Sequence, residues 1–105
     1  MEELNKKLAL WAGISIDEFI MYPEDYNFTD PEFGIARCFK VLVPKLYNLI
    51  GFRLLSYQYI GFARNIDMLR HGWGIHFESG VNYHASERES TLALCLAIEK
   101  LIGEK

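Results

Sequence analysis

Two histidines and a glutamate are the residues of this chain best suited to do chemistry. His76 and His84 stand on either side of Ser79 and Gly80, in segments where apolar and polar residues alternate. Such alternation is typical of strands, whose successive side chains point to opposite faces, so we predict a β-hairpin. Two imidazoles, with Glu78 on the same face, are ligands that Zn²⁺ and similar cations accept.

The register of this hairpin decides whether the two histidines are neighbours. A two-residue turn would place His84 on the same face as Phe77, mixing polar and core residues. A three-residue loop, Ser79 to Val81, instead pairs Phe77 with Tyr83 and His76 with His84. We therefore expect the longer loop, with the two histidine Cβ atoms about 5 Å apart.

The sequence gives this pair no third strong ligand, and it has no HExxH or CxxC spacing. Structural metal sites normally show a fuller ligand set. We therefore predict no metal site and no cofactor, and keep a metal-binding role for His76 and His84 as an alternative.

No motif typical of an enzyme is present. The serines, including Ser56 and Ser79, lack a GxSxG setting, and no glycine-rich phosphate loop is followed by lysine. Cys38 and Cys95 fall on apolar helical stripes, where thiols are usually inert, so we read them as reduced core residues. The sequence therefore predicts no catalytic residue, and we expect no enzymatic activity.

Basic residues concentrate in the middle of the chain, although the net charge is −3. Tyrosines are interleaved with them, as in grooves that bind single-stranded nucleic acid. A negative overall charge opposes such binding, which depends on neutralising phosphates. A weak nucleic-acid-binding role therefore stays an alternative, carried by Arg37, Lys40, Lys45, Arg53, Arg64 and Arg70 with Tyr57, Tyr59 and Phe62.

The periodicity predicts a single domain over residues 1–105, of the α+β class. We expect a three-stranded, mostly antiparallel sheet layered with two long helices, and a short N-terminal helix at one end or on the second face. Pro44 should bend the first long helix, which Asp30 caps. The expected helices span 2–12, 30–50 and 87–102, the last capped by Ser86 with Glu89; the strands lie near 53–59, 73–78 and 81–85, with a connection over 65–72 that includes one helical turn.

Several segments resemble the phage ABA sandwich domain of small bacteriophage and prophage proteins. The similarity runs from Asn27–Pro31 into Cys38–Leu46, and returns in Ala93–Leu101 after a Trp-containing strand and Tyr83 to Ala85. It rests on apolar spacing, and residues 53–72 do not follow the family pattern. The resemblance implies an α-β-α layered sandwich and a gene of phage origin expressed in a bacterial cytoplasm. It implies no activity.

Fifteen aromatic residues among 105 are more than one small core readily hides. Some of them should form an exposed patch, and such patches usually mark sites of association. The apolar runs are too short to span a membrane. The exposed aromatics favour a non-enzymatic protein-binding module whose partner is another protein or a second copy. Together with what the resemblance implies, we expect a phage or prophage accessory protein of the host cytoplasm.

Overall fold

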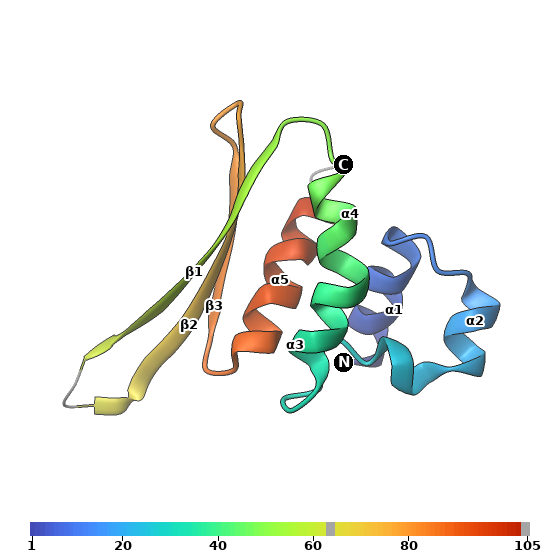
Figure 1. The fold of residues 1–105 in the computed structure, drawn as a ribbon. Helices are drawn as coiled ribbons and strands as arrows, with labels where there is room; N and C mark the ends of the chain where they lie inside the picture. Colours follow the sequence, from blue (N-terminus) through green and yellow to red (C-terminus); the bar gives the residue numbers. More distant parts are fainter. Residues whose placement is uncertain (63–64, 104–105) are drawn as a thin grey trace.

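The fold is built on one antiparallel sheet, with its helices stacked on one side (Figure 1). The computed structural model describes residues 1–62 and 65–103, without the side chains of residues 60–68. The predicted α+β class is confirmed. The elements are α1 (Glu2–Trp11), α2 (Ile16–Met21), the 3₁₀ helix η1 (Pro23–Tyr26), α3 (Gly34–Arg37), the π-helical segment η2 (Cys38–Leu42), α4 (Val43–Tyr47), β1 (Phe52–Phe62), β2 (Asn65–Phe77), β3 (Asn82–Glu87) and α5 (Ser90–Gly103).

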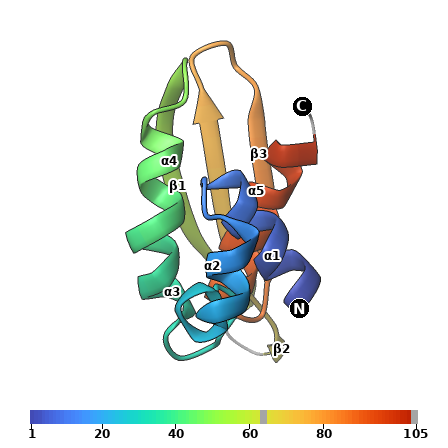
Figure 2. The same ribbon diagram turned by 90° about the vertical axis from the view of Figure 1, so that its right-hand side faces the viewer.

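The helices form successive layers behind the sheet, whose strand order is β1-β2-β3. α5 packs on β2 and β3, and α1 packs on α5. Figure 2, viewed from the side of α2, shows α1 and α2 in front and the strands at the back. The N-terminal helix was expected at an end of the sheet or on its second face. It lies behind α5 instead, because Leu4, Leu8 and Ala9 join the same apolar core as α5. Among the described residues, no helix covers the opposite face of the sheet.

The first long helix begins later than predicted, at Gly34 of α3 rather than directly after Asp30. The Asp30 carboxylate accepts the backbone N–H of Phe33 at 2.6 Å, but this bond closes the turn over residues 31–33, and Phe33 at the N-cap makes no side-chain capping bond. The interruption expected at Pro44 is present. Pro44 has no N–H to donate, so the regular helical ladder cannot continue through it. The chain responds with a π-helical segment, in which the N–H of Val43 donates to the Cys38 carbonyl five residues earlier.

Two expectations near the sheet are wrong. Residues 65–72 were expected to be a connection with a helical turn, but β2 begins at Asn65, which pairs with Phe62 of β1. Residues 65–72 find backbone hydrogen-bond partners in β1, and the β-propensity of their own sequence does not reveal these partners. Ser86 is not a helix cap, because it pairs with Gly72 inside β3, and α5 begins at Ser90.

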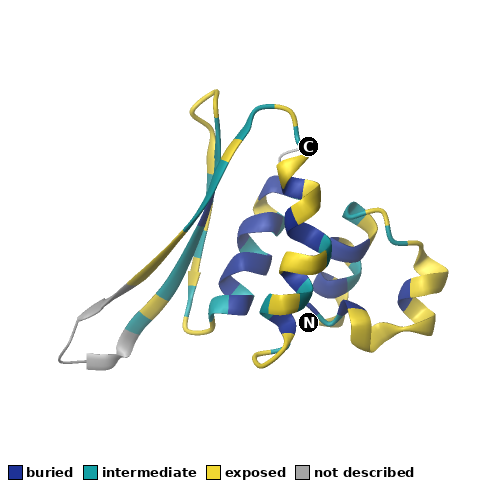
Figure 3. Cartoon of the chain, viewed as in Figure 1, coloured by how far each residue is buried: buried dark blue, intermediate teal, exposed yellow. Residues whose placement is uncertain are grey.

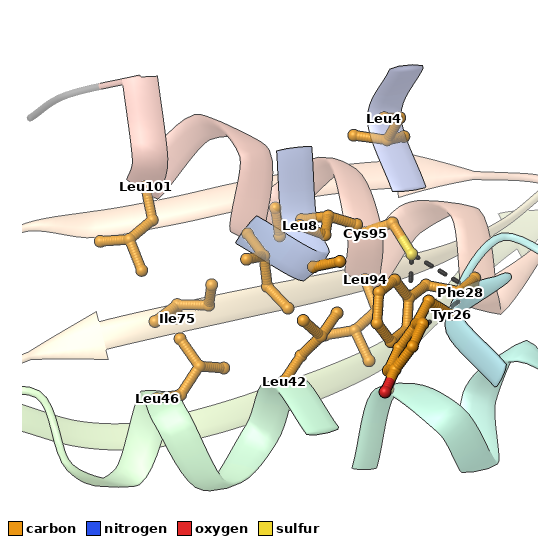
Figure 4. Packing of buried hydrophobic residues seen from close by; sticks show 14 of the residues in the cluster. Leu4, Leu8, Tyr26, Phe28, Leu42, Leu46, Ile75, Leu94, Cys95 and Leu101 are labelled. Carbon is orange, nitrogen blue, oxygen red and sulfur yellow. Dashed lines mark hydrogen bonds between the residues drawn. The ribbon is translucent and has the colours of Figure 1, made fainter. Parts of the chain in front are cut away.

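The core lies between the sheet and the helices, where Leu46 of α4, Ile75 of β2 and Leu101 of α5 point toward one another (Figure 4). At its far end Cys38 and Cys95 are fully buried, with their Sγ atoms 3.7 Å apart. The hydrogen bond with Cys38, and then burial, raise the pKa of the Cys95 thiol well above its ordinary value. Both cysteines are free, buried core residues, as the apolar stripes predicted. No helix in the described part of the chain is long and apolar enough to cross a bilayer.

Candidate functional site

The β2–β3 hairpin has the predicted odd-length loop, but its register is shifted by two residues. His76 pairs with Asn82, and Gly74 pairs with His84. The loop is residues 78–80, closed by the N–H of Phe77 donating to the Val81 carbonyl. Gly80 has a φ of 92°, a conformation that glycine adopts without strain, and this fixes the turn one residue earlier than expected. Because the loop length stays odd, each side chain keeps its predicted face.

The two histidines are therefore diagonal neighbours rather than direct cross-strand partners. Their ring centroids are 5.2 Å apart and their planes meet at 78°. They lie on the sheet face that no described helix covers, opposite to the face of Ile75 and Phe77. The structure thus brings the predicted pair together, although by a different register.

A chain of hydrogen bonds passes through His76 and joins all three strands. Ser56 of β1 lies with its Oγ 2.7 Å from His76 Nε2. On the other side of the ring, His76 Nδ1 lies 2.9 Å from Asn82 Oδ1 of β3. An amide oxygen only accepts, so Nδ1 carries the proton of the neutral imidazole. Nε2 is then an acceptor, and the Ser56 hydroxyl donates to it.

Gly74 makes room for this chain. A Cβ at position 74 would lie 2.8 Å from both His76 Nε2 and Ser56 Oγ, and 2.9 Å from His84 Cε1. Any side chain there would therefore displace the serine or an imidazole. Glycine inside a strand often marks close approach of another group. The glycines of β2 form the floor of a cavity of about 440 Å³, whose lining includes Ser56, Gln58, Gly72, Gly74, His76, His84, Ser86 and Lys100.

The metal alternative has a specific obstacle in this geometry. Both ring nitrogens of His76 already take part in hydrogen bonds, so a cation would have to displace Ser56 or Asn82. Glu78 is in the turn, where its N–H donates to the Gly51 carbonyl. In the described part of the chain, no three side chains of His, Cys, Asp or Glu come together as a metal ligand set.

The basic residues of the middle segment are partly engaged within the fold. Arg37 lies 3.7 Å from the Asp30 carboxylate, and Arg70 lies 3.8 Å from that of Glu87. The Lys45 ammonium is 5.8 Å from the centre of the Trp11 ring. Lys40 and Arg53 are exposed, and Arg64 lies outside the described residues.

A row of aromatic rings occupies the helix-facing side of β1 and β2. It lies on the part of these strands that leads away from the helices, whose course Figure 1 shows. Tyr57 packs on Trp73 with centroids 5.1 Å apart, and Tyr59 packs on His71 at 4.9 Å. Phe39 of η2 closes the row against Trp73 at 5.9 Å. Tyr57 and Tyr59 are nevertheless about half exposed, with relative exposures of 47% and 56%. In Figure 3 these strands are largely exposed or intermediate, whereas the buried residues gather on the helices.

The two edges of the sheet differ in how they are protected. On β3, the Lys100 ammonium of α5 donates to the His84 carbonyl, and the strand has six residues. β1 has eleven residues, without lysine or proline, and its single charge is Arg53 near one end. Lysine, proline, β-bulges and short length are the usual protections of an edge strand, and of these β1 has only register irregularities near its two ends, between Phe52 and Leu54 and between Ile60 and Phe62. β1 therefore presents the less protected edge.

A search of protein-family models, of curated proteins and of solved structures finds no match to this chain. The site must therefore be interpreted from its own geometry.

The sequence pointed to His76 and His84 but missed Ser56, Gly74 and Asn82. The lack of a GxSxG motif around Ser56 says nothing about which residues face it across the sheet. A signal was available, because Ser56 alternates with Tyr57 and so belongs to the polar face of its strand. What was missing was the register of β1 on β2, which depends on the segment mistaken for a connection.

Proposed function

We propose that this chain is a phage- or prophage-encoded accessory protein that acts by binding protein through the edge of β1. The observation that carries this proposal is the difference between the two edges of the sheet. An eleven-residue edge with one charge offers a row of backbone N–H and C=O groups to an added strand. The phage origin and the bacterial cytoplasm rest on the resemblance of the sequence.

The aromatic row supports a protein as the ligand. Tyr57 and Tyr59 lie beside the open edge and are about half exposed, so a strand added to β1 would cover them. Tyrosine and tryptophan are enriched where proteins bind one another, because they bury a large area and keep a polar tip.

The partner that fits best is a second copy of the chain. Two β1 strands pairing antiparallel about a two-fold axis would exchange the same backbone groups. Because Arg53 lies near one end of β1, such pairing places the two guanidinium groups at opposite ends. Like charges are thus kept apart.

The nucleic-acid alternative has less support. Arg37, Lys45 and Arg70 already contact Asp30, Trp11 and Glu87 respectively. A phosphate backbone would have to compete with these contacts, and the net charge of the chain is −3.

The test is light scattering coupled to size exclusion, over a series of protein concentrations. Wild type should form a dimer, and Tyr59→Lys should shift it toward monomer, since lysine on an edge strand opposes pairing. Tyr22→Lys is the matched control, because Tyr22 is a similarly exposed tyrosine (53%) at the end of α2, on the far side of the helices from the sheet. A wild type that stays monomeric throughout, or a Tyr59→Lys variant that dimerises like wild type, would contradict the proposal.

A further inference from the structure

The polar face of the sheet supports a role distinct from the edge of β1. Ser56, His76 and Asn82 have the order and spacing of a nucleophile, a general base and a residue that orients the base. The Ser56–His76 and His76–Asn82 distances of 2.7 Å and 2.9 Å lie within the range such groups use. We propose that Ser56 is a nucleophile that accepts an acyl group from small carboxylic esters.

The tautomer of His76 gives the serine its base. Because Asn82 accepts from Nδ1–H, the lone pair of Nε2 faces the Ser56 hydroxyl and can take its proton. A neutral asparagine fills this orienting position in Cys-His-Asn sites on other folds, so a carboxylate is not required.

The surroundings leave room for a substrate above the serine. Gly74 is directly opposite Ser56 across the strands, and its missing Cβ keeps Ser56 Oγ and His76 Nε2 uncovered from that side. The cavity of about 440 Å³ over this floor fits a small acyl group. Gln58, two residues along the same face, and Lys100 of α5 are among the residues that line it. An amide N–H₂ and an ammonium are donors suited to negative charge on a carbonyl oxygen, and the Lys100 ammonium also donates to the His84 carbonyl.

The reaction balances without any added cofactor. His76 Nε2 takes the hydroxyl proton as Ser56 Oγ bonds to the carbonyl carbon, and the ester C–O bond then breaks. The leaving alkoxide takes that proton from His76 and departs as an alcohol. Water, giving a proton to His76, next attacks the acyl carbon. The Ser56 oxygen leaves with that proton, so ester and water become acid and alcohol.

The experiment is labelling of the whole chain with a fluorophosphonate, which bonds to activated serines with loss of fluoride. Intact mass and peptide mapping follow the adduct. Wild type should carry one adduct on Ser56, absent from Ser56→Ala. His76→Gln should react about 100-fold more slowly, a typical contribution of a general base. Ser79→Ala should react like wild type, because Ser79 is an exposed serine of the turn outside this cavity.

Thermal melting of each variant separates loss of the base from loss of the fold. If His76→Gln does not fold, Asn82→Ala replaces it, and its labelling should also slow, because the imidazole is then no longer oriented. No adduct on wild-type Ser56 would overturn the proposal. So would an adduct that forms equally fast in a folded His76 or Asn82 variant.

Discussion

The two faces of the sheet share one backbone but have opposite chemistry. On one face Ile75 is fully buried between Leu46 and Leu101. On the other face, Ser56, His76 and Asn82 form a hydrogen-bonded chain in the space that Gly74 leaves. The difference follows from the helices, which stack behind one another instead of covering both faces. Because the helices stack on one side, the other face of the sheet has no apolar layer packed on it. Hydrogen bonds position the side chains there, and glycine leaves the space that they occupy.

The largest expected effect is on the covered face. Ile75→Ala removes a fully buried side chain among rigid neighbours and should lower the free energy of unfolding by about 2–5 kcal/mol. Denaturant unfolding followed by circular dichroism measures this. A loss close to zero would mean that the covered face is not packed as described.

A smaller loss is expected from adding one methyl group to the polar face. Gly74→Ala would force a Cβ against His76 and Ser56, and overpacking of this kind costs about 1–3 kcal/mol. Gly103→Ala is the matched control, because a Cβ there meets nothing within 4 Å. Equal unfolding curves for Gly74→Ala and wild type would show that the polar chain has space to spare.

The smallest effect is expected from Zn²⁺. Binding to the folded state alone would raise stability by about 2.7 kcal/mol at a hundredfold excess over the dissociation constant. Because both nitrogens of His76 are engaged, we expect the melting temperature to stay unchanged. A Zn²⁺-dependent rise in the melting temperature of wild type that is lost in His84→Ala would support the metal-binding alternative. The polar face would then be stabilised by a bound cation as well as by hydrogen bonds.

The sequence was sufficient where a signal is local. The interruption of the helix before Pro44 and the odd-length turn are each decided by a few neighbouring residues, whereas Asp30 caps only the turn that precedes α3. Sequence-based prediction was wrong where the structure of a segment depends on pairing with a strand distant in the sequence. β2 extends back to Asn65 because β1 pairs with it, and Ser56 meets His76 only through that register. The predicted position of α1 was wrong for a similar reason. The sequence of an amphipathic helix shows that it has an apolar face, but it does not show which surface that face packs against.

The carbonyl of Phe28 accepts the thiols of both Cys38 and Cys95, from residues 10 and 67 positions later in the chain. The same oxygen lies so close to α3 that a Cβ on Gly34 would sit 2.4 Å from it. One backbone atom therefore joins the N-terminal third to the helix before the sheet and to the helix after it. Long-range closure of this kind makes folding slower but cooperative. The N-terminal helix α1 packs against α5, so it cannot complete its packing before the last helix has formed.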